Sequence, residues 1–141
     1  MLVRLLYASH SAKPVTPDVI ESILEQSRKH NPRLGITGIL CQSGNTFLQV
    51  LEGGRSAVNR LYNRIVADPR HRDVELLLYQ EIAERRFAGW SMGQVDMARL
   101  NPALLLKYSE TATLDPYAVS GDVSMALFEE LVATAAIVGP A

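Results

Sequence analysis

The chain has 141 residues, enough for one domain, and 48% of them are hydrophobic, which suffices for a single packed core. With 14 basic and 15 acidic residues the net charge is −1, so no general attraction to nucleic acid or to an anionic membrane is expected. Cys41 is alone and excludes an internal disulfide, and we find neither a signal peptide nor an apolar run of the ~20 residues that cross a bilayer. We therefore expect a soluble, cytoplasmic protein.

The first predicted element is a β-strand over residues 2–7, where apolar residues dominate. Because successive side chains of a strand point to opposite faces, Val3, Leu5 and Tyr7 should share one face, and Arg4 should lie on the other. A tyrosine hydroxyl would then lie on a face that is otherwise apolar.

A helix is predicted next. Thr16 is a typical N-cap, Pro17 is tolerated in the first turn, and apolar residues follow at helical spacing, namely Ile20, Ile23 and Leu24. We expect the helix to run to about His30, because Pro32 disfavours the helical conformation for Asn31.

Residues 35–41 and 46–52 are two β-prone runs, and the intervening residues 42–45 are typical of a hairpin connection. In the second run, one face should carry Phe47, Gln49 and Leu51. An amide would therefore share a face with large apolar side chains.

The pattern after Gly53-Gly54 indicates a second amphipathic helix that ends before Asp68, with Val58, Leu61, Tyr62 and Ile65 on its apolar face. Residues 74–79 and 90–95 are predicted to form two further strands. The order βαββαββ favours an α+β, ferredoxin-like sandwich: a five-stranded mixed sheet with two helices on one face.

The remainder of the chain indicates C-terminal helices, one short around residues 104–106 and one longer around residues 125–132. We expect residues 1–97 to form the main domain. Residues 98–141 should form a helical extension that packs on this domain or in an oligomer interface.

Common catalytic signatures are missing: the sequence has no P-loop, no GxGxxG, no HExxH and no spacing typical of a metal site. More informative are Tyr7 and Gln49, because a buried hydroxyl or amide without a partner costs roughly 1–3 kcal/mol. If their strands are neighbours, both would point into the space between sheet and helices. Taken singly, Tyr7 could also be an ordinary core aromatic, Gln49 a solvent-facing residue, and Asn31 a helix terminator.

Four blocks together make the pattern specific: residues 31–40 (NPRLGITGIL), 47–53 (FLQVLEG), 68–71 (DPRH) and 86–92 (RFAGWSM). In this order and spacing the chain resembles the BLUF family of blue-light receptors that use FAD. The resemblance covers roughly residues 1–97, and the tail around residues 106–109 is similar to that of the short PixD-type members.

The resemblance implies a flavin between the two helices, above the sheet. Tyr7 would be the light-driven electron and proton donor, and Gln49 would bridge it to the flavin. Trp90 and Met92 match a strand pair whose environment changes on illumination. The implied flavin-binding set is Tyr7, His30, Asn31, Ile36, Phe47, Gln49, Arg64, Asp68, Arg70 and His71.

The implied function is that of a photoreceptor module and not of an enzyme, with FAD, or else FMN, as the cofactor. Its output would be a change of homo-oligomeric assembly or of binding to an unidentified signalling partner. Two alternatives remain open, a flavin-dependent or hydrolytic enzyme on the same fold and a light-inert interaction module. The enzyme would need a substrate cavity at the flavin edge, which Tyr7 and Gln49 should occupy.

Overall fold

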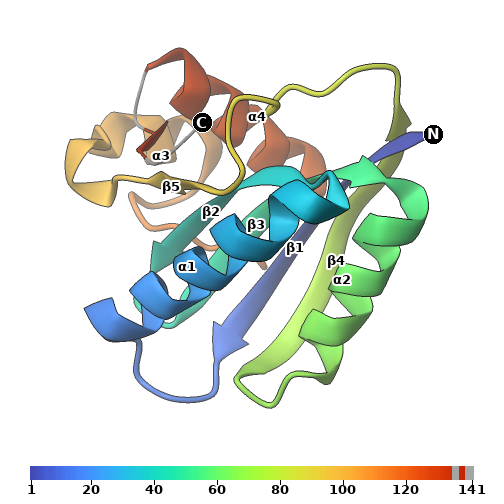
Figure 1. Cartoon of the computed structure of the whole chain (residues 1–141). Helices are drawn as coiled ribbons and strands as arrows, with labels where there is room; N and C mark the ends of the chain where they lie inside the picture. Colours follow the sequence, from blue (N-terminus) through green and yellow to red (C-terminus); the bar gives the residue numbers. More distant parts are fainter. Residues whose placement is uncertain (135–136, 139–141) are drawn as a thin grey trace.

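A computed structural model describes residues 1–134 and 137–138, which form one mixed β-sheet with helices on both faces (Figure 1). The sheet has six strands in the order β4-β1-β3-β2-β5-β6. All neighbouring strands are antiparallel except β2 and β5, which are parallel. The α+β, ferredoxin-like architecture expected from the sequence is confirmed, with a sixth strand that was not expected.

The strands are β1 Leu2–Ser11, β2 Thr37–Ser43, β3 Thr46–Gly54, β4 His71–Ile82, β5 Gly93–Val95 and β6 Ile137–Val138. The helices are α1 Pro17–Leu34, α2 Arg55–Ala67, α3 Pro102–Tyr108 and α4 Gly121–Ala133, with a single 3₁₀ turn at Met97–Arg99. Among these described helices, none combines the length and the hydropathy that crossing a bilayer requires.

The central strands β1 and β3 are buried on both faces. On one face, Val3, Leu5 and Tyr7 pack with apolar residues of α1 and α2, as the alternation predicts. On the other face, Leu6, Leu48 and Val50 pack with residues of α3 and α4. Figure 1 shows α1 and α2 in front of the sheet and α4 behind it. The fold thus has three layers. We call the core facing α1 and α2, where the resemblance places a flavin, the flavin-side core, and the core facing α3 and α4 the tail-side core; both include residues of β1 and β3.

Helix α1 is one turn longer than the sequence indicated. Thr16 caps its start by accepting a hydrogen bond from the Val19 amide, as expected. The predicted end near His30 is wrong, because the helix passes through Pro32 and ends at Leu34. Proline removes one backbone donor but does not prevent the following turn. Gly35, in the left-handed conformation with φ 69°, ends the helix instead by donating to the last carbonyls.

The last expected strand, 90–95, is wrong at its start, since β5 contains only Gly93–Val95. Residues 90–92 are an irregular segment whose carbonyls bond to α1 and β2 rather than to a strand ladder. A Cβ on Gly93 would approach Ile137 and Trp90 within 3 Å, so glycine is needed where this segment enters the sheet.

The apolar residues of the tail mostly face the sheet. Leu105, Leu127, Phe128 and Leu131 are buried, and Leu104 and Val132 are partly buried against the same cluster. Leu106 remains exposed. Most of the apolar surface of the described tail is therefore covered within the chain itself.

This packing predicts that Phe128 contributes strongly to stability. Phe128 is fully buried and makes an edge-on contact with Phe87 at 6.3 Å between ring centroids. Phe128→Ala should lower the free energy of unfolding by ~3–5 kcal/mol, measured by chemical denaturation. Leu106→Ala, on the exposed side of α3, should change it by less than ~0.5 kcal/mol. Equal small effects would contradict the described position of α4.

Candidate flavin site

The centre of the candidate site is a chain of three side chains, Tyr7, Gln49 and Met92. Tyr7 and Gln49 are direct partners in the antiparallel register of β1 and β3, and both are at most 5% exposed. The Tyr7 hydroxyl donates a hydrogen bond to Gln49 Oε1. At the other end of the amide, Gln49 Nε2 donates to Met92 Sδ at 3.3 Å. A phenol, a carboxamide and a thioether thus form one buried relay.

The irregular segment 90–92 is held against this relay by three donors from neighbouring elements. The Gly38 amide donates to the Trp90 carbonyl at 3.0 Å. Asn31 Nδ2 donates to the Ser91 carbonyl at 3.1 Å, and Arg28 Nε donates to the Met92 carbonyl at 3.2 Å. Three successive carbonyls therefore have partners, and the position of Met92 is fixed from α1 and β2.

A cavity of about 300 Å³ opens above the relay, between α1 and α2. Its floor comes from β1, β2 and β3 through Tyr7, Leu40, Phe47 and Gln49. Its walls come from α1 through Ile23, Gln26, Ser27, His30, Asn31 and Leu34, and from α2 and the following turn through Leu61, Arg64, Ile65, Asp68, Arg70 and His71. Such a volume lies at the lower end of the range for small-molecule sites.

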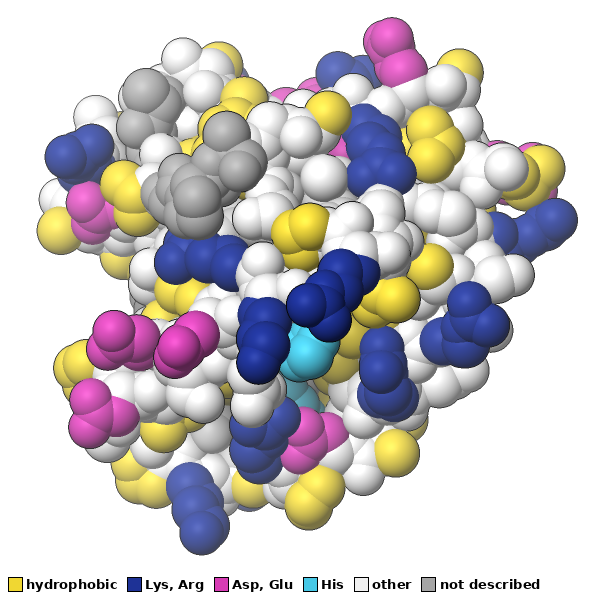
Figure 2. Space-filling model, viewed as in Figure 1, with side chains coloured by type: hydrophobic (Ala, Val, Ile, Leu, Met, Phe, Trp, Pro, Cys, Tyr) yellow, Lys and Arg dark blue, Asp and Glu magenta, His cyan; other side chains and the backbone are white. Residues whose placement is uncertain are grey.

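Basic side chains gather at the mouth of this cavity. Figure 2 shows Lys and Arg side chains around a histidine on the face formed by α1 and α2. Arg64 and Arg70 line the cavity and are largely exposed, and Asp68 binds the Arg70 guanidinium through two oxygens. The Arg70 hydrogen bonds hold the pKa of Asp68 below its usual range. Among the described residues, Arg64 makes no ion pair, and it lies next to the paired Asp68 and Arg70.

Burial governs the two titratable groups inside the cavity. It raises the pKa of Tyr7 far above that of a free phenol, with smaller contributions from Tyr62 and Asp68. It also lowers the pKa of His71, against the opposing attraction of Asp68. Ser9 Oγ lies 2.9 Å from His71 Nδ1, and the His71 ring packs against Phe47. Tyr7 is thus held as a neutral phenol and His71 as a neutral imidazole.

The structure brings most of the sequence-predicted residues together and separates two of them. Trp90 is half-buried and packs against the tail-side core, so Met92 and not Trp90 contacts Gln49. Ile36 is buried in the flavin-side core but does not line the cavity. The other predicted residues line the cavity, and Met92 adjoins it through Gln49.

Sequence reasoning missed several wall residues that helical periodicity could have found. On α1, residues 23, 26, 27, 30, 31 and 34 recur every three or four positions and form one face. On α2, residues 61, 64 and 65 do the same, and Asp68 follows directly after the helix. Arg28 was also missed. Its role as a donor to the Met92 carbonyl has no local sequence signal, since the two residues are 64 positions apart.

A larger and more open hollow, about 860 Å³, lies on another flank of α1, next to Gln42 and Gln94. It contains none of the candidate residues. No group of three or more His, Cys, Asp or Glu side chains within residues 1–134 and 137–138 is arranged to bind a metal.

The cavity between α1 and α2 fits the ring of a flavin in its chemistry. Apolar walls such as Ile23, Leu61 and Ile65 suit the faces of a flat heterocycle. The polar edge of that ring carries carbonyl oxygens and an N–H, and the amides of Asn31 and Gln49 offer both donors and acceptors. An apolar cavity with the amides of Asn31 and Gln49 in its lining and Arg side chains at its mouth is suited to a flavin that binds without a covalent bond.

Comparisons with known proteins also indicate a flavin-binding protein. Residues 2–93 match the family described as BLUF, sensors of blue-light using FAD. The chain is 34% identical over 97 residues to the blue light- and temperature-regulated antirepressor BluF of Escherichia coli strain K12, covering 69% of this chain and 24% of that protein. It superposes on the photo-activated state of BlsA with a TM-score of 0.82 and 32% identity, covering 94% of this chain and 95% of that one. It superposes on the dark state of the BLUF protein BlrB with a TM-score of 0.79 and 36% identity, covering 95% of this chain and 96% of that one.

The chain therefore belongs to the BLUF family and is a flavin-binding blue-light sensor. FAD is the cofactor for which the family is described. The chain spans about a tenth to a quarter of the length of the first curated relatives it matches. By contrast, it spans nearly the whole of the solved BlsA and BlrB chains named above.

The burial of His71 predicts a defined pH dependence of stability. Because the pKa of His71 is lower in the folded protein than in the unfolded chain, the unfolded chain binds the proton first as the pH falls. The contribution of His71 is complete above a pH of about 6.5 and is lost below it, down to the folded-state pKa. Free energies of unfolding measured between pH 7.5 and 5 should therefore fall less steeply for His71→Gln. Identical slopes would contradict the described burial.

Proposed function

We propose that Tyr7 and Gln49 form the light-operated switch of this photoreceptor, and that Met92 reads the state of the switch. The observation that carries this proposal is the buried relay from the Tyr7 hydroxyl through the Gln49 amide to Met92 Sδ. When bound, the flavin absorbs blue light and accepts an electron in its excited state. Tyr7, the only phenol on the cavity floor within the described residues, is the donor.

Gln49 supplies two states because a carboxamide has one accepting and one donating end. In the structure the oxygen faces Tyr7 and the NH₂ group faces Met92. Rotation or tautomerisation would exchange which group faces the phenol and which faces the cavity. Gln49 would hold the polar edge of a bound flavin, and a change in its hydrogen bond there would alter the absorption slightly, without covalent chemistry.

The residues at the mouth of the cavity support binding rather than turnover. Arg64 and Arg70 are placed to meet the phosphates of an FAD tail, and Asn31 and His30 lie on the facing helix. An enzyme would need room for a substrate beside the polar edge of the ring. Tyr7, Gln49 and Met92 fill that position, so we infer a sensor module and not an enzyme.

The switch predicts a small, reversible red shift of the flavin absorption under blue light. Tyr7→Phe and Gln49→Leu should each retain flavin and lose the red shift, because each removes one end of the relay and keeps the apolar bulk. Absorption spectra in the dark, under blue light and after dark recovery measure this directly.

Tyr62→Phe is the matched control for the first variant. Tyr62 lies 5.7 Å from Tyr7 between ring centroids, but it is more exposed and does not hydrogen-bond to Gln49. This control should keep the red shift. A normal photocycle in Tyr7→Phe, or a protein that takes up no flavin, would contradict the proposed function.

The output of the sensor is proposed to pass from residues 90–95 to the C-terminal helices, and from there to a homo-oligomer interface or a signalling partner. Trp90 supports this route, because it is three residues from the Gly93–Val95 strand and packs against the tail-side core. The described part of the tail is mostly covered within the chain, so the light-dependent contact would be a small rearrangement between two packed states.

This output predicts a light-dependent shift in assembly or partner binding. A coupling of ~1–3 kcal/mol would change a self-association constant by about 5- to 150-fold. Size exclusion with light-scattering detection, run in the dark and under blue light over a range of concentrations, measures it. Identical profiles in wild type and Gln49→Leu under both conditions would remove self-association as the output and leave a separate partner.

A further inference from the structure

A second polar pair crosses the same two strands, on the opposite face from Tyr7 and Gln49. Arg4 and Glu52 are direct partners in the register of β1 and β3, and both are almost completely buried. Arg4 donates to Glu52 Oε2 through Nε at 2.8 Å and Nη2 at 2.6 Å. Burying two charges is costly unless every remaining hydrogen-bonding site is used.

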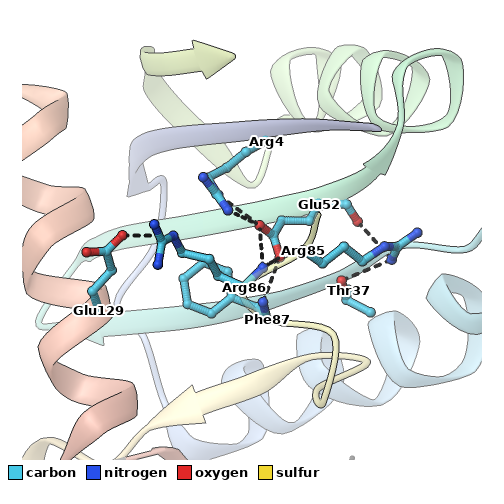
Figure 3. Close-up of polar contacts among 7 residues, drawn as sticks. All are labelled: Arg4, Thr37, Glu52, Arg85, Arg86, Phe87 and Glu129. Atoms are coloured by element: carbon cyan, nitrogen blue, oxygen red, sulfur yellow. Dashed lines mark hydrogen bonds and ion pairs between the residues drawn. The ribbon is translucent and has the colours of Figure 1, made fainter. Parts of the chain in front are cut away.

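The remaining sites of Glu52 are used by the backbone of the loop after β4. Glu52 Oε1 accepts from the Phe87 amide at 2.7 Å and from the Arg86 amide at 3.0 Å, as Figure 3 shows. Arg85 adds a bond to Thr37 Oγ1 at 3.1 Å. One buried carboxylate therefore anchors a loop that has no regular structure of its own.

The anchored loop leads directly to the relay. Phe87 is buried against Phe128 of α4, and its carbonyl accepts from the Trp90 amide at 3.2 Å. Two residues after Trp90, Met92 places its sulfur against Gln49. The chain thus passes from the tail-side face at residue 87 to the flavin-side face at residue 92. At the first end it is fixed by Glu52, and at the second by Gly38, Asn31 and Arg28.

We propose that Glu52 is a positioning residue of the photoreceptor: by accepting the Arg86 and Phe87 amides, it holds residues 87–92 so that Met92 Sδ stays against Gln49. This inference rests on the proposed role of Gln49. A thioether is a weak acceptor, so the Met92 contact depends on its position being enforced by the backbone. The same anchor ties the relay to α4 through Phe87.

The test separates the acceptor role of Glu52 from its ion pair. Two double variants lack the buried charges: Arg4→Met with Glu52→Gln, and Arg4→Met with Glu52→Leu. Replacing a buried ion pair by neutral side chains is often tolerated. The glutamine protein keeps a carboxamide oxygen that can still accept from the Arg86 and Phe87 amides. The leucine protein has no acceptor at this position. Each is purified with flavin, and its red shift, dark-recovery rate and thermal midpoint are measured.

In the glutamine protein the recovery rate should remain close to that of wild type. In the leucine protein, recovery in the dark should be faster by about tenfold. A rate factor of this size results when a barrier falls by the free energy of one buried hydrogen bond. The reason is that a looser segment lowers the barrier for the Gln49 amide to return. A recovery rate that is slower, or less than about threefold faster than in the glutamine protein, overturns the proposal.

Epistasis shows whether the effect passes through Met92. In a Met92→Leu background the same two double variants should recover at rates that differ by less than about twofold, because the contact they act on is already gone. Persistence of the full difference would show that Glu52 acts by another route and would overturn the proposal. If the leucine protein fails to fold, the variant Glu52→Asp with Arg4 retained takes its place. The shorter side chain cannot reach both the Arg86 and Phe87 amides, so the same threshold of about threefold in the recovery rate applies.

The failure of this inference is distinguishable from failure of the proposed function. If wild type shows no red shift, the switch itself is wrong. If wild type shows a normal red shift and the two double variants recover alike, only the positioning role of Glu52 is wrong.

Discussion

The antiparallel register of β1 on β3 is the constraint on which the rest of the site depends. It pairs Tyr7 with Gln49 on one face and Arg4 with Glu52 on the other. A slip of one residue in either strand would turn both polar pairs toward the wrong cores and leave four polar side chains without partners. The same register thus satisfies the buried polar groups of two separate layers. Both the flavin-side core and the tail-side core depend on the pairing of β1 with β3.

This arrangement explains how an event at Gln49 can have consequences on the far side of the sheet. Strands β1 and β3 are closely packed on both faces, so they have little room to rearrange themselves. The irregular segment from Arg85 to Met92 goes around them instead, with one end against the amide and the other against α4. It has few backbone bonds of its own and many to its neighbours. Under the proposed switch, a rearrangement of this segment would reach α4 without a change in the pairing of β1 and β3.

Much of the fold could be predicted from the sequence because its signals are local. Alternation placed Tyr7 on the correct face, and helical spacing and the Thr16 cap found α1 and its start. The end of α1 could not be predicted from Pro32, because the helix accommodates this proline in its last turn and the left-handed Gly35 ends it. Local pattern also suggested a strand at residues 90–92, but hydrogen bonds from Gly38, Asn31 and Arg28 determine their path. Whether Trp90 or Met92 meets Gln49 is settled by these distant donors.

The burial of the Tyr7 hydroxyl also bears on the reliability of the signal. A tyrosine is neutral at cellular pH, and desolvation moves the pKa of Tyr7 still further above that range, so this residue holds one protonation state. Its hydroxyl proton is bonded to Gln49 and lies beneath the cavity, where exchange with bulk water is hindered. A change in the pH of the surroundings therefore does not remove the proton from this residue. If Tyr7 is the donor as proposed, such a receptor would seldom signal in the dark, because the proton of its donor is shielded from the solvent.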